Sequence, residues 1–306
     1  MNPYILFILA PNISPAQLEK VVELIHLLAF KVEDINSMDN LSLDIVNRLP
    51  RTCFKLRILG KSENQVLLEK ALKSLTKDLE IDFSLQIEDI NRTARKLICF
   101  DMDSTLIQTE VIDELAIHAG VGEQVKAITE SAMRGEIDFK ASFKKRVALL
   151  RGLDEAVMKE VLDKLPLSEG LDDLMFHLKK QGYKIAILSG GFTYFASHLQ
   201  QKYGIDYMYA NQLEIEAGKL TGRYVGEIVD GKYKLDKLIE IATKENIKLE
   251  QTIALGDGAN DLPMIKVAGL GIAFHAKPKV QEQATHLINS VGIDGILYYL
   301  GIERPD

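Results

Sequence analysis

Residues 97–105 read LICFDMDST, in which four apolar residues are followed at once by two carboxylates and two hydroxyls. Two later stretches have the same form: residues 185–191 read IAILSGG, and residues 253–261 read IALGDGAND. Short apolar runs without alternation are typical of parallel strands that are buried on both faces. Because ligands bind at the carboxyl edge of such open sheets, we expect the three polar clusters to meet in one crevice.

The pattern around these runs predicts a doubly wound, Rossmann-like α/β domain over residues 95–306. The third of these runs gives a strand at Thr252–Leu255, a further strand is expected at Leu270–Phe274, and amphipathic helices are expected at Leu171–Gln181 and Leu235–Glu245. Residues of about 112–168, between the first two strands, are helical in pattern throughout. This stretch predicts a helical cap inserted into the domain.

Residues 1–90 predict a second, smaller α+β domain. Its order is strand, helix, strand, strand, helix, strand, and the located elements are Tyr4–Ala10, Pro15–Leu28, Thr52–Leu59, Asn64–Leu79 and Ile81–Ile87. Ser14 before Pro15 is a good helix start. The order implies an antiparallel sheet with its helices on one face, and the polar segment Asp89–Lys96 is expected to be a linker.

Composition excludes several classes of partner. The 306 residues carry a formal net charge of -7, which argues against nonspecific binding to nucleic acid or to anionic lipid. No apolar run approaches the length of a membrane span, and the apolar start lacks a basic flank. We therefore expect a protein that binds neither nucleic acid nor membranes. Cys53 and Cys99 lie in apolar runs without metal-binding spacing, so we also expect a reduced cytoplasmic protein.

The carboxylates at the predicted sheet edge favour a divalent cation. Asp101, Asp103 and Asp257 would repel one another by about 4 kcal/mol per pair at about 4 Å and an effective dielectric near 20. A bound cation removes that cost, and ligation by oxygen alone favours Mg²⁺. Taken singly, Asp101 and Asp103 are equally consistent with acidic turn residues or a helix cap.

Such a site is suited to hydrolysing a phosphate monoester. A carboxylate beside a cation can attack phosphorus, and a second carboxyl can give the leaving group its proton. Asp101 and Asp103 supply both groups from one turn. Ser189 and the Gly190 amide can donate to phosphoryl oxygens, and a lysine counter-charge is expected. On their own, the Ser-Gly-Gly sequence is also a common turn and the lysine also a common surface residue.

These motifs together resemble the haloacid dehalogenase superfamily of phosphohydrolases. That family carries Asp-x-Asp-x-Thr, a Ser or Thr after a second strand, a Lys, and a Gly-Asp-x-x-x-Asp loop. The matching residues are Asp101, Asp103 and Thr105, then Ser189, Lys234, Asp257 and Asp261. Lys232 and Lys237 lie close by, but Lys234 has the best spacing to Asp257.

Within the superfamily, residues 95 to about 295 resemble the phosphoserine phosphatases. The resemblance implies that phosphoserine is the substrate, that Asp101 is the nucleophile and Asp103 the general acid, and that Mg²⁺ binds Asp101, Asp103 and Asp257. It implies that Glu110 and Arg146 grip the substrate's ammonium and carboxylate, and that Met133 and Phe139 shield the pocket. Phosphate would be held by Ser189, Gly190, Lys234 and Asn260.

Two other functions fit the same motifs. One is phosphoryl transfer to another alcohol such as homoserine, or hydrolysis of a different small phosphate. The other is a serine-sensing regulatory protein that has lost its chemistry, against which the full set of carboxylates argues. Residues 1–90 resemble an ACT-type ligand-binding module in element order only. A dimerisation or stabilising domain is an equal alternative, with a homodimer formed through it.

Overall fold

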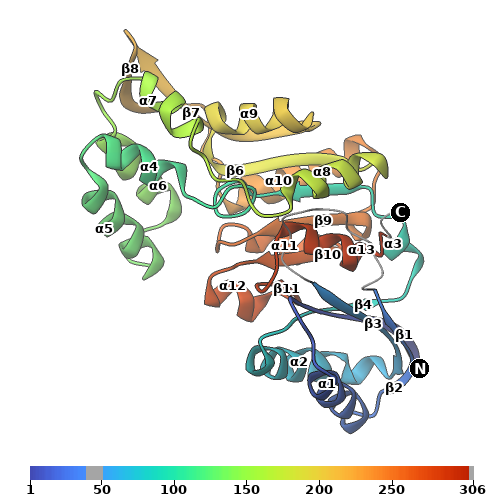
Figure 1. Cartoon of the computed structure of the whole chain (residues 1–306). Helices are drawn as coiled ribbons and strands as arrows, with labels where there is room; N and C mark the ends of the chain where they lie inside the picture. The colour runs from blue at the N-terminus through green and yellow to red at the C-terminus, as the bar shows by residue number, and fades with distance from the viewer. Residues whose placement is uncertain (39–50, 303–306) are drawn as a thin grey trace.

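The computed structural model describes residues 1–38 and 51–302, which form strands and helices in layers (Figure 1). The strands are β1 (Asn2–Ala10), β2 (Lys31–Ser37), β3 (Thr52–Gly60), β4 (Asp82–Ile87), β5 (Leu97–Phe100), β6 (Lys184–Phe192), β7 (Tyr207–Glu216), β8 (Lys219–Val225), β9 (Thr252–Gly256), β10 (Leu270–Phe274) and β11 (His286–Ile288). They form an 11-stranded sheet in the order β2-β3-β1-β4-β11-β10-β9-β5-β6-β7-β8.

Helices cover both faces of this sheet. They are α1 (Pro15–Leu27), α2 (Gln65–Leu79), α3 (Ile90–Thr93), α4 (Val111–His118), α5 (Gly122–Met133), α6 (Phe139–Leu149), α7 (Ala156–Leu162), α8 (Leu171–Lys180), α9 (Thr193–Tyr203), α10 (Gly231–Lys244), α11 (Leu262–Val267), α12 (Pro278–Gln283) and α13 (Ile296–Leu300). Three short 3₁₀ turns lie at Ser62–Asn64, Leu249–Gln251 and Ile293–Gly295.

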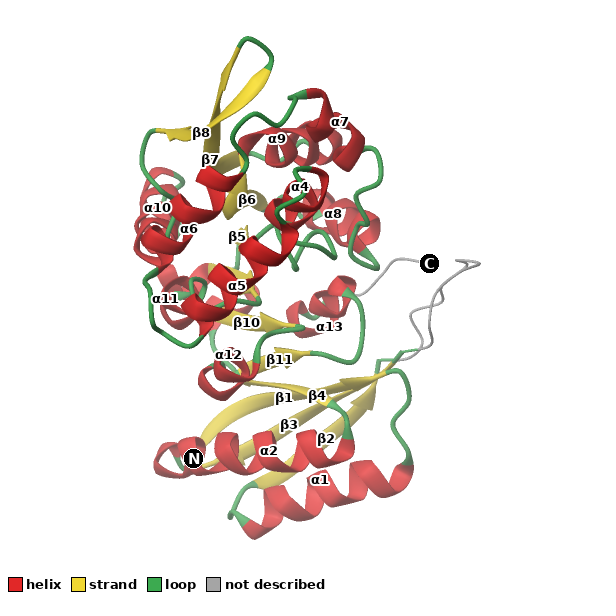
Figure 2. Ribbon diagram, turned by 90° about the vertical axis from the view of Figure 1, so that its left-hand side faces the viewer, coloured by secondary structure: helices red, strands yellow, loops and turns green. Residues whose placement is uncertain are grey.

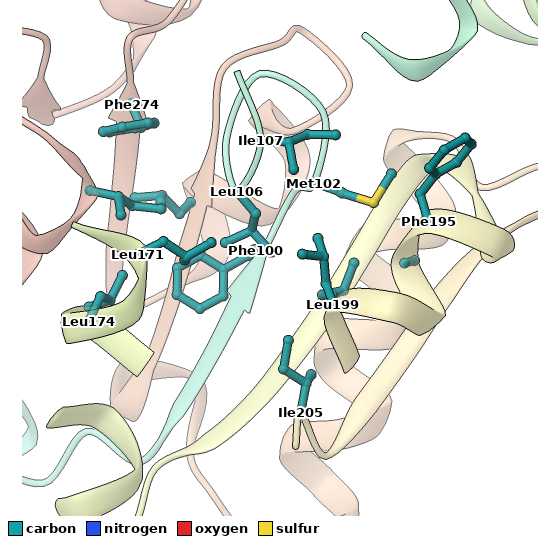
Figure 3. Packing of buried hydrophobic residues seen from close by; sticks show 14 of the residues in the cluster. Phe100, Met102, Leu106, Ile107, Leu171, Leu174, Phe195, Leu199, Ile205 and Phe274 are labelled. Carbon is teal, nitrogen blue, oxygen red and sulfur yellow. The ribbon is translucent and has the colours of Figure 1, made fainter. Parts of the chain in front are cut away.

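The parallel α/β sheet expected from the sequence is confirmed. Strands β11, β10, β9, β5, β6 and β7 pair in parallel, and β5 lies between β9 and β6. Alternate residues of β5 enter two different cores, Ile98 and Phe100 one and Leu97 and Cys99 the other. Figure 3 shows Phe100 packed near Leu171 and Leu174 of α8. This burial on both faces explains the unbroken apolar run before Asp101.

The amino-terminal strands β2, β3, β1 and β4 are antiparallel, in the element order that the sequence predicts. Helices α1 and α2 cover one face of them, below the sheet in Figure 2. Ser14 and Gln17 form the capping box that starts α1. The other face meets α13, where the ring centroids of Phe7 and Tyr299 are 5.8 Å apart. Whether this unit is an ACT-type module stays a prediction.

The two sheets are continuous, which the sequence did not indicate. Strand β4 pairs with β11 through Ser84 and His286, whose side chains also meet at 2.9 Å. Asp82 accepts hydrogen bonds from the backbone amides of Asn289 and Ser290 at 2.7 and 2.8 Å. The segment expected to be a linker contains one helical turn, α3, because the Asp89 carboxylate caps it at the Arg92 amide.

Helices α4 to α7 (the helical segment, residues 111–162) fill most of the stretch that the sequence predicts to be helical. The hairpin of β7 and β8, for which there was no prediction, binds to it (Figure 1). Gly152 donates to the Leu220 carbonyl at 2.8 Å, and the Phe143 and Tyr224 rings pack edge to face at 5.4 Å. Within residues 1–38 and 51–302, none of the helices is long and apolar enough to cross a membrane.

Candidate active site

The loop after β5 places two carboxylates in a tight turn. The Asp101 amide donates to the Leu255 carbonyl at 2.9 Å, so Asp101 lies at the last rung between β5 and β9. The amides of Thr105, Leu106 and Ile107 all donate to the Met102 carbonyl at 3.2, 2.8 and 3.1 Å. Ser104 has a φ of 56°, the left-handed conformation that closes such a turn. The turn holds Asp101 and Asp103 on the sheet edge.

Asp103 is suited to carry a proton. Its side chain is buried, and its Oδ1 has no hydrogen-bond partner among the described residues. Burial raises the pKa of Asp103 well above its usual value, and the charges of Glu110 and Asp101 raise it further. Glu110 itself accepts a hydrogen bond from the Ser104 hydroxyl at 2.9 Å. This upward shift of the pKa favours the protonated carboxyl, the form that a proton donor requires.

The irregular carboxyl end of β6 is held beneath the cavity by hydrogen bonds. Ser189 is fully buried, and its hydroxyl oxygen accepts from the Gly191 amide at 2.9 Å. Asn211 of β7 donates to the Gly190 carbonyl at 2.8 Å and accepts from the Val229 amide at 2.9 Å. Sequence reasoning missed Asn211, because a lone asparagine in an irregular strand carries no motif. The two hydrogen bonds of Asn211 fix the backbone at the carboxyl end of β6.

Lys234 of α10 joins two of the loops. Its side chain is fully buried, and its Nζ lies 2.9 Å from Asp101 Oδ1 and 2.6 Å from Asp261 Oδ1. Burial alone would lower the pKa of Lys234, but the charges of Asp101 and Asp261 raise it, so the ammonium stays charged. The other Asp261 oxygen accepts from the Gly258 amide at 2.9 Å. Asp261 therefore uses both oxygens to hold Lys234 and the loop after β9.

The acidic cluster fits a divalent cation. Asp101, Asp257 and Asp261 each offer an oxygen, all within 4.8 Å of one another. Burial raises the pKa of Asp257 to about 6 and that of Asp261 to about 8. The buried carboxylates leave an excess of negative charge that a cation such as Mg²⁺ would neutralise, and the nearby Asp103 Oδ1 has no hydrogen-bond partner among the described residues. The predicted role of Asp103 as a ligand stays a prediction, since it lies outside this group.

A cavity of about 690 Å³ opens over these groups, between the sheet edge and the helical segment. Most of the residues predicted for the site line it: Asp101, Asp103, Glu110, Met133, Phe139, Arg146, Gly190, Asp257 and Asn260. Ser189 and Lys234 lie buried beneath it rather than in its wall. The wall also contains residues that the sequence did not single out, among them Ser104, Asp113, Asp230 and Lys277. Ser104 occupies the variable position between Asp103 and Thr105, and the other three stand in no motif that spacing could reveal.

Comparison with known proteins decides the family. The family model of haloacid dehalogenase-like (HAD) hydrolases matches residues 95–269, which include the loops after β5 and β9 and the carboxyl end of β6. The chain belongs to the HAD-like hydrolase family. A phosphoserine phosphatase of Haemophilus influenzae is 48% identical over 225 residues, which are 74% of this chain and 72% of that protein. The resemblance found in the sequence is confirmed, and this HAD-like protein is a phosphoric monoester hydrolase.

Solved structures of HAD-like hydrolases are similar over different extents. A HAD family hydrolase from Salmonella enterica serovar Typhi covers 98% of this chain and 100% of its own, at 33% identity and a TM-score of 0.83. A phosphoserine phosphatase solved as a phospho-aspartyl intermediate analogue is 44% identical, with a TM-score of 0.64, over 67% of this chain and 98% of its own. The first therefore extends over the amino-terminal unit as well.

Proposed function

We propose that this protein hydrolyses O-phosphoserine to serine and phosphate through an aspartyl-phosphate on Asp101. The observation that carries the proposal is the distribution of charge around one cavity. Asp101 and Asp103 lie at its sheet edge, and Glu110 and Arg146 also line it. A phosphoryl group over the aspartates would leave a carboxylate and an ammonium for Arg146 and Glu110. The similar phosphoserine phosphatases support this substrate.

The chemistry follows from the two carboxyls of the turn. Asp101 attacks phosphorus, so that an oxygen–phosphorus bond forms as the bond from phosphorus to the serine oxygen breaks. Asp103 in its protonated form gives its proton to that oxygen. Asp103 then takes a proton from water as the water attacks the aspartyl-phosphate, which releases phosphate and restores both side chains.

Lys234 fixes the position of the nucleophile. It holds Asp101 Oδ1 at 2.9 Å, and the Met102 amide donates to the same oxygen at 2.7 Å. The other Asp101 oxygen is then the one to attack. Gly190 and Asn260 line the cavity wall where phosphoryl oxygens would lie, while the buried Ser189 supports this wall from below.

Mg²⁺ would be held by Asp101, Asp103 and Asp257. When bound, such an ion offsets the negative charge of the phosphoryl group and aligns it for attack. The residues present fit it, since the donors are oxygens alone and the buried carboxyls carry raised pKa values without it. Asp261, with both oxygens already used, is better placed to hold Lys234 than to bind the ion.

The helical segment acts in the proposal as a cap that closes over the substrate. Phe139 at the start of α6 lies against the carboxyl end of β6: a Cβ on Gly190 would be 3.0 Å from Phe139 Cζ. Lys140 Nζ and Asp230 Oδ2, 3.1 Å apart, link α6 to the loop before α10. Met133 is exposed but lines the cavity, where closure would bring it onto the substrate.

The test is phosphate release from phosphoserine with and without Mg²⁺. Activity should require the ion, and Asp101→Asn should abolish it while the fold is kept, as judged by circular dichroism. A panel of phosphate monoesters with acceptor alcohols such as homoserine separates hydrolysis from transfer. The substrate assignment fails if phosphoserine ranks low in the panel. A chain without any Mg²⁺-dependent hydrolysis would instead be a regulatory protein.

The remaining expectations belong to this proposal. Phosphoserine hydrolysis would complete serine biosynthesis in the cytoplasm, where the buried thiols of Cys53 and Cys99 would stay reduced. The amino-terminal unit would bind an amino acid or join two chains into a homodimer. Light scattering at several concentrations, with and without serine, distinguishes these two roles.

A further inference from the structure

Positively charged side chains are unevenly distributed around the cavity. Among its described lining residues, the basic ones are Arg146 and Lys277. Arg146 lies on α6, in the helical segment, whereas Lys277 follows β10 at the sheet edge. Lys234 is fully buried, and its ammonium is taken up by Asp101 and Asp261. Lys277 is therefore the cation of the sheet edge that faces the space above the aspartates.

The backbone of Lys277 is fixed beside Asp257. Its amide donates to the Asp257 carbonyl at 3.1 Å, and Pro278 starts α12 directly after it. Its Nζ lies 3.4 Å from Asp257 Oδ2, longer than a strong charge-assisted hydrogen bond. The side chain is 46% exposed, so the ammonium can move while its attachment stays in place. Within residues 1–38 and 51–302, Asp257 is the carboxylate that lies within 4.0 Å of this ammonium.

We propose that Lys277 is a further phosphate-binding residue, whose ammonium contacts the phosphoryl group of the substrate and the released phosphate. The inference rests on the proposed function, in which the phosphoryl group lies above Asp101 and a divalent ion binds Asp257. A lysine ammonium has three donors, and the long contact to Asp257 leaves donors for phosphoryl oxygens. Lys277 thereby supplies the cation that the buried Lys234 cannot bring to the cavity wall.

The proposal makes two predictions of opposite sign. Loss of the Lys277 charge weakens phosphate binding, because an anion loses its cation at the sheet edge. The same change leaves divalent ion binding unchanged or tightens it, because Lys277 competes with the ion for the Asp257 carboxylate. If Lys277 only held Asp257 in place, its loss would weaken ion binding. The two measurements together therefore separate phosphate binding from a structural role.

The experiment compares Lys277→Met with Lys279→Met in the full chain. Lys279 is exposed in the first turn of α12, two residues after Lys277, and its variant loses the same charge, but it does not line the cavity. Inorganic phosphate is the probe, through its inhibition constant and by calorimetry, and Mg²⁺ binding is measured separately without phosphate. Lys277→Met should raise the phosphate inhibition constant and KM about five- to tenfold, while Lys279→Met changes neither.

Two further variants make the test decisive. Lys277→Arg should keep most of the phosphate binding, and Lys277→Gln replaces the methionine variant if that one does not fold. An unchanged phosphate inhibition constant overturns the proposal, as does Mg²⁺ binding that weakens in parallel with phosphate. The calorimetric titrations of phosphate and of Mg²⁺ use no phosphoserine, so they still decide the role of Lys277 if that substrate proves to be wrong.

Discussion

Gly191→Ala tests whether the position of Asp103 controls the chemistry. A Cβ at residue 191 would lie 2.7 Å from Asp103 Oδ2, 2.8 Å from Met102 Cε and 3.1 Å from Ser189 Oγ. An ordinary contact needs about 3.4 Å, so the Asp103 carboxylate must retreat by roughly 0.7 Å. Because a misplacement of about 1 Å can cost about 100-fold in rate, we expect kcat to fall about 10- to 100-fold.

The assay is steady-state phosphate release from phosphoserine, repeated with p-nitrophenyl phosphate. The nitrophenolate leaves without a proton, so the variant should lose less activity on it than on phosphoserine if the displaced group is the general acid. Gly122→Ala is the matched control, since a Cβ there has its nearest neighbour, Ile117 Cγ1, at 3.6 Å. A Gly191→Ala protein that melts like the wild type and keeps kcat within twofold would refute the reasoning.

Three other perturbations follow from the structure. Lys234→Met leaves two buried carboxylates without their cation. The free energy of unfolding, measured in urea, should therefore fall by about 3–5 kcal/mol. A loss below about 1 kcal/mol would contradict the role of these ion pairs. Burial lowers the pKa of His286 to about 3, so the unfolded chain binds a proton below about pH 6.5 that the folded chain does not. Stability should therefore fall as the pH drops from about 6.5 toward 3, by about 2 kcal/mol at pH 5 from this group, and His286→Asn should lose less than the wild type between pH 8 and 5. Mg²⁺ at about 100 times its dissociation constant should stabilise the fold by about 2.7 kcal/mol over chelated protein, and an Asp257→Asn variant with an equal gain would show that the ion binds elsewhere.

The sequence was most informative where a buried strand ends in a polar motif. The runs before Asp101, Ser189 and Asp257 are apolar without interruption because both faces of the sheet are covered, and this made the sheet edge predictable. Two elements that the sequence did not locate lack such burial. Strand β2 has mostly exposed side chains as an edge strand, and the β7–β8 hairpin is only partly buried. Neither has the alternation that identifies a strand.

Contacts between residues far apart in the chain could also not be predicted from the sequence. The pairing of β4 with β11 depends on Ser84 and His286, which are 202 residues apart in the chain. The motifs predicted Asp261 as part of a loop, but only the fold shows that it holds Lys234. Lys277 enters the cavity wall because α12 starts beside Asp257, and a single lysine has no spacing by which to recognise it.

The most direct test of the proposed mechanism is to trap the covalent intermediate with borohydride during turnover of phosphoserine. The reagent reduces an aspartyl-phosphate to homoserine, which peptide mass spectrometry can locate in the chain. The mechanism predicts homoserine at residue 101, in the presence of both substrate and Mg²⁺, and none in the Asp101→Asn variant. Trapping at another carboxylate, or continued turnover in the Asp101→Asn variant, would contradict it.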